Sequence, residues 1–329
     1  MTQRNELLKV GLIGVGKWGA KIARTIREEL PGLHLHRAVT KKLEAQKDVG
    51  AQCTLHNKWQ ELFTGNDIDA LILAIPPRYN CEVACVALNR HIPVFIEKPM
   101  ACNSADAYEI LNVAIQNQGI AEVDHIDLFN PVFCKMKRSI HEPIKKIFAR
   151  IGAPYERRSD ISPLWEYAPH FIAATLALMG KMPIAVKGNY LPRETPPFQD
   201  PSKEIVQIVF DFGDGSDVCI EAGNGMNKKV RSLDVFLESK MFHFEDCAAT
   251  PLSSSDMFNP GQKVSIALPI DTLPLTAALQ CFEFKVREGK HNVAGVEMGV
   301  KVVTLLEAVT QSLETHDWSP VTQPWYLRE

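Results

Sequence analysis

The stretch Pro93-Val94-Phe95-Ile96-Glu97-Lys98-Pro99 decides how the rest of the chain is interpreted. Its apolar residues are β-branched or aromatic and lie between prolines, which is typical of a short buried strand. An acid and a base follow at the carboxyl end, where open α/β sheets bind their ligands. Lys98 is therefore the first catalytic candidate, and Pro99 could hold the Lys98-Pro99 bond cis. Taken alone, these residues are better explained as a strand that ends in a solvated ion pair, so other motifs must decide.

A glycine-rich loop lies near the start of the chain. The apolar residues 9–13 lead directly into Gly14-Val15-Gly16-Lys17-Trp18-Gly19, and apolar residues at helical spacing follow. At such a strand-to-helix junction Gly14 permits a tight turn, Gly16 lets a pyrophosphate approach the backbone, and Gly19 lets the helix pack closely on the strand. Phosphates would then meet the positive end of the helix. We predict a dinucleotide site here, and the alternative is a structural turn.

The end of the second expected strand, residues 33–39, bears on which dinucleotide binds. NAD sites usually carry an acidic residue there, but this chain has Thr40, followed by Lys41 and Lys42. A hydroxyl and two cations suit a 2′-phosphate, so we expect NAD(P) as the cofactor, with NADP(H) slightly favoured. The alternative is that Lys41 and Lys42 only begin a solvated helix.

Two differently organised regions follow from the pattern of strands and helices. Up to residue 123 the two alternate, which predicts an α/β, doubly wound parallel sheet of the Rossmann type. From residue 145 strand-like stretches follow one another around one long helix, which predicts an α+β domain with a large, mainly antiparallel open sheet. We expect a dinucleotide-binding domain over residues 1–124. Residues 125–329 would form a substrate-binding and oligomerisation domain, whose final helices could pack back on the first.

The expected elements of the first region are strands at residues 68–75, 93–96 and 119–123, helices at 83–88 and 105–117, and an amphipathic helix marked by Trp59, Leu62 and Phe63. Those of the second are a helix at residues 165–179 and strands at 147–151, 184–190, 205–212, 217–222, 232–238 and 242–246.

The composition is that of an ordinary globular protein. The 329 residues are enough for two domains, 46% of them are hydrophobic, and the net charge of −3 gives no basis for binding nucleic acid or an anionic membrane. The first residues lack the apolar core of a signal peptide, and no apolar run approaches the roughly 20 residues that span a bilayer. We expect a cytoplasmic protein that acts on a small molecule and binds neither nucleic acid nor a membrane.

The eight cysteines give no metal site. None forms a Cys-x-x-Cys pair, and although Cys81 and Cys85 lie one helical turn apart, no histidine or acidic cluster completes a set of ligands. We expect reduced core thiols and no metal.

Three motifs together resemble a known family. The glycine loop, Ala74-Ile75-Pro76-Pro77 and Glu97-Lys98-Pro99-Met100 resemble the Gfo/Idh/MocA oxidoreductases, named for glucose-fructose oxidoreductase and inositol dehydrogenase. The resemblance continues in Asn130-Pro131, in residues 164–170 and around Glu297-Met298-Gly299. It implies a dehydrogenase that acts on CH-OH groups of a sugar, sugar nucleotide or cyclic polyol. The cofactor-binding residues that we assign are Gly14, Val15, Gly16, Lys17, Trp18, Gly19, Thr40, Lys41, Ala74, Ile75, Pro76, Pro77, Asn80, Glu97 and Lys98.

The long helix supplies the acid-base candidates. Glu166 and His170 are four residues apart and share one face. A histidine, whose ordinary pKa is about 6.5, can take a proton from a substrate hydroxyl and return it, and Glu166 could orient the imidazole or bind a neighbouring hydroxyl. The resemblance implies that Lys98 and His170 converge beside the nicotinamide, where the ammonium stabilises a developing alkoxide. The alternative is a core histidine that the backbone satisfies.

The chain departs from the family pattern at three positions. Glu166 stands where Asp is usual, Phe171 where a second acid often follows the histidine, and Asn80 where His is frequent. Residues 124–131 and 165–170 are most similar to the branch that acts on sugar nucleotides. Tyr155 and the arginines after it could bind a carboxylate or phosphate of the substrate, or form a charged strand edge. The substrate-binding candidates are Lys98, His125, Tyr155, Arg157, Trp165, Glu166 and His170.

Two functions stay open at this point. Lys98 and His170 favour an enzyme, whereas Glu166 and Phe171 favour a non-catalytic NAD(P)-binding regulator or sensor with the same fold. The resemblance also implies pairing through the open face of the second domain's sheet. Residues 206–210 alternate with apolar side chains that need a cover, so we expect a homodimer or homotetramer.

Overall fold

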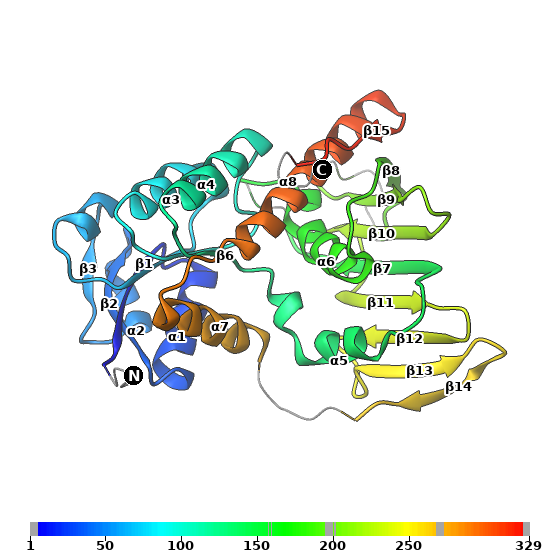
Figure 1. Ribbon diagram of the computed structural model, residues 1–329, viewed down its shortest axis with the longest axis horizontal. Coiled ribbons are helices and arrows are strands. Elements are labelled where there is room, and N and C mark those ends of the chain that lie inside the picture. The colour runs from blue at the N-terminus through cyan, green and yellow to red at the C-terminus, as the bar shows by residue number, and fades with distance from the viewer. Residues whose placement is uncertain are drawn as a thin grey trace. The chain divides into compact units, whose positions relative to one another are not determined.

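The computed structural model describes residues 6–156, 158, 160–194, 200, 202–267 and 273–324 (Figure 1). The chain divides into two compact units. The first comprises residues 1–126 and 272–300, and the second residues 127–271 and 301–329. Each unit is thus built from two separate stretches of the chain, and the segment that returns to the first unit contains a whole helix.

The first unit is built on a parallel sheet of six strands in the order β3-β2-β1-β4-β5-β6. This order confirms the predicted Rossmann sheet, and its direction reverses between β1 and β4, where such sheets bind ligands. The strands are β1 (Leu8–Ile13), β2 (Leu33–Val39), β3 (Thr54–His56), β4 (Ala70–Leu73), β5 (Val94–Ile96) and β6 (Ala121–Val123).

Helices flank this sheet (Figure 1). They are α1 (Lys17–Glu29), α2 (Gln46–Val49), α3 (Asn80–Leu88), α4 (Ser104–Gln116) and α7 (Pro274–Glu288), with 3-10 turns η1 (Leu43–Ala45), η2 (Trp59–Phe63) and η3 (Pro77–Tyr79). The amphipathic helix expected around Trp59 is only the short turn η2. Its apolar spacing reflects local packing, since the Trp59 and Phe63 rings meet edge to face at 5.8 Å between centroids.

Helix α7 belongs to the core of the first unit. Phe282 of α7 and Phe95 of β5 are both buried, with ring centroids 5.4 Å apart. The Thr276 hydroxyl donates to Glu29 of α1, and Arg287 donates to the carbonyl of Gly32 at 2.9 Å. Apolar packing and polar contacts therefore both attach residues 274–288 to the sheet and to α1.

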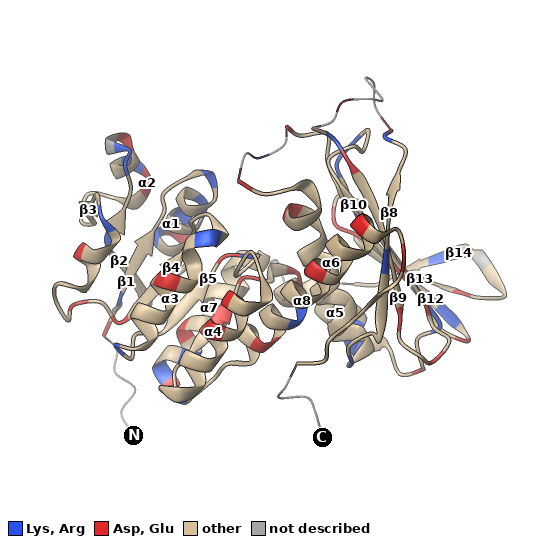
Figure 2. Ribbon diagram, turned by 90° about the horizontal axis from the view of Figure 1, so that it is seen from above, with Lys and Arg blue, Asp and Glu red and all other residues tan. Residues whose placement is uncertain are grey.

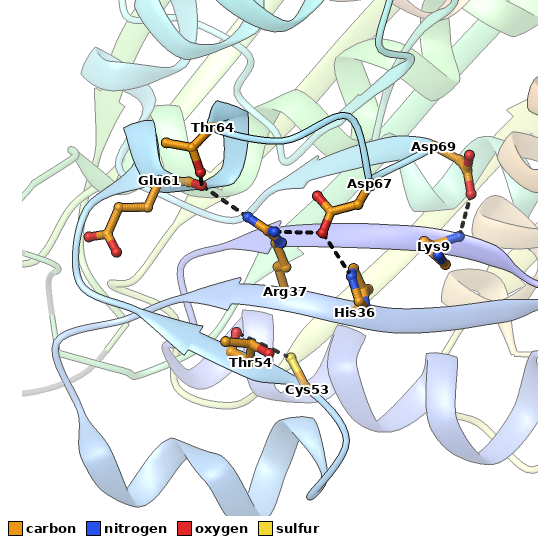
Figure 3. A network of polar contacts seen from close by, with 9 residues as sticks. All are labelled: Lys9, His36, Arg37, Cys53, Thr54, Glu61, Thr64, Asp67 and Asp69. Atoms are coloured by element: carbon orange, nitrogen blue, oxygen red, sulfur yellow. Dashed lines mark hydrogen bonds and ion pairs between the residues drawn. The ribbon is translucent and has the colours of Figure 1, made fainter.

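A polar network fixes the segment between η2 and β4 on the sheet (Figure 3). One carboxylate oxygen of Asp67 lies 2.5 Å from Arg37 Nη2 and 3.1 Å from His36 Nε2, both on β2. The same guanidinium donates to the carbonyl of Glu61 at 3.1 Å. Burial disfavours the charged Asp67, but His36 and Arg37 hold the pKa of its carboxyl below the ordinary value. One oxygen of Asp67 thus contacts both cations, whereas its other oxygen, Oδ1, is buried without a hydrogen-bond partner among the described residues.

The second unit contains a nine-stranded sheet in the order β14-β13-β12-β11-β7-β10-β9-β8-β15. Neighbouring strands are antiparallel except for the parallel pair β7 and β10, which confirms a mainly antiparallel sheet. The strands are β7 (Lys146–Gly152), β8 (Ala185–Leu191), β9 (Ile205–Asp211), β10 (Asp217–Gly223), β11 (Val230–Phe236), β12 (Lys240–Glu245), β13 (Leu252–Asp256), β14 (Asn259–Ser265) and β15 (Ser319–Pro320).

One face of this sheet is covered by α6 (Pro163–Met179), which packs against β10, β7 and β9. Val206, Ile208 and Phe210 on β9 point to that face and are buried, in register with apolar residues of β10. The argument that these side chains need a second subunit as cover is therefore wrong, because a helix of the same chain covers them. Pairing of subunits stays a prediction.

The remaining elements are η4 (Ile126–Phe129), α5 (Pro131–Ser139) and α8 (Ala294–Thr315), whose residues up to Val300 belong to the first unit. Among the described residues, no helix combines the length and apolarity that a bilayer span requires. Acidic and basic residues are both scattered along the elements of the two units (Figure 2).

Candidate functional site

The glycine loop follows β1 and has a backbone that only glycine allows. Gly14 has φ +95°, and a Cβ placed on it would lie 2.3 Å from the carbonyl oxygen of Ala74, the residue after β4. A Cβ on Gly19 would lie 1.9 Å from the carbonyl oxygen of Gly14. The loop is thus closed against the neighbouring strand and against its own helix, as the sequence pattern predicts.

Gly16 differs from these two glycines because the space above it is open. No heavy atom lies within 4 Å of where its Cβ would be, and Gly16 is exposed. It is the N-cap residue of α1, and no side chain caps this helix. An uncapped helix start beside open backbone fits a phosphate group, so these residues fit the pyrophosphate of a dinucleotide.

Trp18 of the loop connects it to the end of β5. The indole N–H of Trp18 donates to a carboxylate oxygen of Glu97, and the Lys21 ammonium lies 4.6 Å from the centroid of the Trp18 ring. The two motifs that the sequence analysis treated separately are therefore joined by a side-chain hydrogen bond. The single side-chain hydrogen-bond donor of Trp18 is thus bound to Glu97.

Lys98 follows Glu97 at the carboxyl end of β5, and the Lys98-Pro99 peptide bond is cis, as expected. Burial and then the nearby carboxyl of Asp124 raise the pKa of Glu97 well above its ordinary value, while Lys98 and Trp18 oppose the shift. A carboxyl with a raised pKa keeps its proton to a higher pH than an ordinary glutamate does.

The segment after β4 brings Asn80 to the start of α3. Ala74, Ile75 and Pro76 are half-buried, and Pro77 is buried at the start of η3. Asn80 is fully buried, and neither atom of its side-chain amide has a hydrogen-bond partner among the described residues. An unsatisfied buried amide costs about 1–3 kcal/mol, so Asn80 offers a donor and an acceptor to a polar ligand.

The end of β2 presents the groups expected to read the ribose. The Thr40 hydroxyl accepts a hydrogen bond from the Lys42 backbone N–H at 3.1 Å. Lys41 and Lys42 are exposed and precede η1. These exposed side chains are compatible with binding of a 2′-phosphate and equally with a solvated start of the next turn.

The second unit places His170 in a cluster of charged side chains. Its Nδ1 lies 2.7 Å from Oδ2 of Asp127, and the other oxygen of Asp127 accepts a hydrogen bond from Arg231. Arg231 Nε in turn lies 3.7 Å from Oδ2 of Asp246. The side chains of Asp127 and His170 are only 3% and 11% exposed. The imidazole is therefore held by a carboxylate, and a backbone carbonyl is not needed to satisfy this nitrogen.

Both members of the Asp127–Arg231 pair stay charged at neutral pH. Burial disfavours the charged Asp127, but Arg231 and His170 hold the pKa of its carboxyl well below the ordinary value. Burial likewise disfavours the charged guanidinium, yet Asp127 raises the pKa of Arg231 above its ordinary value. His170 thus faces an ionised carboxylate.

The other predicted residues of the second unit lie in different surroundings. Glu166 and Trp165 are half-buried on α6, and the indole of Trp165 donates to the Thr310 hydroxyl of α8 at 3.2 Å. Tyr155 is 58% exposed, and Arg157 lies outside the described residues. In the first unit, His125 is buried and only 2% exposed.

Phe171 explains one departure from the family pattern. It is 1% exposed and belongs to the packed face of α6, so it is a core residue at the position where an acid often follows the histidine in the family.

Asp127, Arg231 and Asp246 were missed by the sequence analysis. Asp127 and His170 are 43 residues apart, and no motif joins them. One signal was available for Arg231, because it alternates with Leu233 and Val235 and therefore lies on the buried face of its strand. A cation at such a position needs a buried partner.

The chain is similar in sequence to a known family and to several named enzymes. Residues 8–125 match the model of the GFO_IDH_MocA family, described as an oxidoreductase family with an NAD-binding Rossmann fold. Inositol 2-dehydrogenase 4 of Saccharopolyspora erythraea is 27% identical over 141 residues, which cover 42% of each chain. UDP-N-acetylglucosamine 3-dehydrogenase of Acidithiobacillus ferrooxidans is 24% identical over 185 residues, 55% of this chain and 57% of the relative. The chain thus spans about half the length of these relatives or less.

Solved structures extend the similarity to both units. A protein of Magnetospirillum magnetotacticum MS-1 has a TM-score of 0.83 and 26% identity, covering 92% of this chain and 100% of that one. The Acidithiobacillus ferrooxidans enzyme has a TM-score of 0.79 at 19% identity, covering 94% of this chain and 98% of its own, which is a likeness of fold.

Proposed function

We propose that the chain is an NAD(P)-dependent dehydrogenase, because residues 8–125 match the model of the Gfo/Idh/MocA oxidoreductase family. It would transfer a hydride between nicotinamide and a secondary alcohol or ketone of a sugar, sugar nucleotide or cyclic polyol. The observation that carries the proposal is His170, a histidine held through Nδ1 by the buried carboxylate of Asp127. This is the arrangement of a general base.

The residues of the first unit would hold the cofactor. The open backbone at Gly16 and the uncapped start of α1 would take the pyrophosphate, and the orphaned amide of Asn80 would bind a polar group of the dinucleotide. Thr40 and Lys41 would read the adenosine ribose, with NADP(H) slightly favoured because no carboxylate repels a 2′-phosphate at position 40. When bound, NAD(P) accepts or donates the hydride.

The chain's own residues would manage the proton and the charge. His170 takes the proton of the substrate hydroxyl, and the Lys98 ammonium stabilises the negative charge that develops on the same oxygen. We assign both residues to one oxygen because Glu97-Lys98-Pro99 and Glu166 with His170 resemble the family's motifs.

The relatives support a substrate with several hydroxyl groups. Two of them are named for inositol and for UDP-N-acetylglucosamine, and each of these compounds contains a six-membered ring with secondary alcohols. Glu166, one turn before His170 on α6, would bind a neighbouring hydroxyl of such a ring. Tyr155 and Trp165 would border it.

The test is turnover by the purified protein. It would be incubated with NAD+ or NADP+ and a panel of inositols, sugars and sugar nucleotides, and reduced nicotinamide would be followed by absorbance. We expect oxidation of at least one compound. Tight dinucleotide binding without turnover on any compound would reject the dehydrogenase and favour a sensor with the same fold.

A further inference from the structure

We propose that Asp127, clamped by Arg231, is the positioning residue that fixes the tautomer and orientation of His170. The inference rests on the proposed function, since it assigns His170 its role as base, and it gives Asp127 the orienting role that sequence reasoning offered to Glu166. Four separate segments meet in this cluster: η4 supplies Asp127, α6 supplies His170, β11 supplies Arg231, and the residue after β12 is Asp246.

The hydrogen bond at Nδ1 decides which imidazole nitrogen can accept a proton. An ionised carboxylate only accepts, so Nδ1, which lies 2.7 Å from Asp127, carries the hydrogen. Arg231 Nη2 lies 3.5 Å from the same nitrogen, and with the hydrogen on Nδ1 this longer contact is not a hydrogen bond. In the neutral ring the other nitrogen, Nε2, is then the acceptor. The Asp127 contact therefore leaves Nε2 as the atom that takes the substrate proton.

Arg231 makes the carboxylate available for this purpose. A buried carboxylate without a cation would take up a proton and lose its preference for the Nδ1–H form. Arg231 binds the second oxygen of Asp127, and Asp246 lies behind the guanidinium at 3.7 Å. Asn130 donates to Asp246 at 3.4 Å. Asp246 thus lies on a second side of the guanidinium, as an ion pair at 3.7 Å, and Arg231 Nε has no hydrogen-bond partner among the described residues.

The charges of the cluster also favour the protonated histidine. With His170 neutral, the one guanidinium of Arg231 stands against the two carboxylates of Asp127 and Asp246. A proton on His170 adds a second positive charge, so that two positive charges face the two carboxylates. On its own helix Glu166, one turn away, adds a further carboxylate. Arg231 Nη2 lies 3.5 Å from His170 Nδ1, so this like charge opposes the effect of the carboxylates on the ring.

The same sheet contains a matched control. His243 of β12 bonds through Nδ1 to Asp234 of β11, and Asp234 raises the pKa of His243. Asp234 alternates with Arg231 along β11, so it points to the opposite face of the sheet. Asp234→Asn therefore removes a similar histidine–carboxylate bond away from the proposed site.

Nitrogen NMR of isotope-labelled histidine in the cofactor-free protein tests the inference, with His170 assigned through His170→Gln. We expect His170 to carry its hydrogen on Nδ1 when neutral. In Asp127→Asn that preference should disappear, and the midpoint of the His170 titration should fall by about one pH unit or more. Asp234→Asn should change the signals of His243 and leave those of His170 in place.

Kinetics on a substrate found by the turnover panel supply the second readout. Asp127→Asn should lower kcat/KM by on the order of 10² to 10⁴ with dinucleotide affinity unchanged, while Asp234→Asn should have no effect. An Nε2–H tautomer in the wild-type protein would overturn the inference without any variant, as would an unchanged tautomer and midpoint in Asp127→Asn. Absence of wild-type turnover would instead reject the proposed function, and the NMR result would still decide the role of Asp127.

Discussion

Two substitutions in the glycine loop separate the folding role of its glycines from the binding role. In Gly14→Ala the new methyl group meets the Ala74 carbonyl oxygen at 2.3 Å with the backbone at φ +95°. Strain at positive φ and overpacking against a backbone atom each cost about 1–3 kcal/mol, or about 2–6 kcal/mol together. In Gly16→Ala the methyl group meets no heavy atom within 4 Å, and φ −83° suits any residue. We therefore expect a loss of stability of at most about 1 kcal/mol, which reflects the poorer N-cap.

For dinucleotide affinity we expect Gly16→Ala to have the direct effect. A methyl group on Gly16 fills the space proposed for the pyrophosphate, so we expect the affinity of Gly16→Ala for NAD(H) and NADP(H) to fall at least tenfold, about 1.4 kcal/mol. Denaturant unfolding and fluorescence titration measure the two effects. Gly261→Ala, on β14, also meets no atom within 4 Å and should change neither. Wild-type dinucleotide affinity in Gly16→Ala would refute the binding role.

Three further predictions address the cofactor, the assembly and the core. NADP(H) should bind at least as well as NAD(H), and Lys41→Glu should shift the preference toward NAD(H). A clear preference of the wild-type protein for NAD(H) in a fluorescence titration would refute this prediction. Light scattering at micromolar concentration should give a homodimer or homotetramer, and a monomer would contradict it. Phe282→Ala should cost about 3–5 kcal/mol, because its ring packs on Phe95, whereas Phe284→Ala on the same helix, 61% exposed, should stay within about 0.5 kcal/mol. Similar unfolding midpoints for these two variants would show that α7 does not stabilise the first unit.

Local patterns sufficed for the parallel sheet type of the first unit, although β3 was not expected and the helix expected around Trp59 is only the turn η2. A glycine loop between a strand and a helix, with strands and helices alternating after it, has few topologies that bury its apolar faces. The strand at residues 252–256 was missed in the second unit, since Leu252-Ser253-Ser254-Ser255-Asp256 lacks the apolar alternation that identifies strands. Its membership in the sheet comes from pairing with β12.

In the candidate site, too, some residues could be predicted from local sequence motifs and others could not. Lys98 and His170 could be named because each stands in a short motif. Asp127 and Arg231 could not, because they are 104 residues apart and meet only in the folded sheet. The hydrogen bond between Trp18 and Glu97, 79 residues apart, is likewise a product of tertiary structure. Sequence reasoning thus found the residues proposed to react, and the groups that hold them became visible only in three dimensions.

The central claim is that Lys98 and His170 act on one substrate oxygen. Its most direct test is kcat/KM of Lys98→Met, His170→Ala and the double variant on the substrate found by the turnover panel, with dinucleotide affinity measured alongside. We expect His170→Ala to lose on the order of 10² to 10⁴ and Lys98→Met to lose turnover with its cofactor still bound. The rise of the oxidation rate with pH should vanish in His170→Ala. The double variant should lose less than the product of the two single losses, because both residues serve the same transition state. Near wild-type turnover in both single variants, with dinucleotide bound, would contradict the account and leave Lys98 and His170 as structural residues.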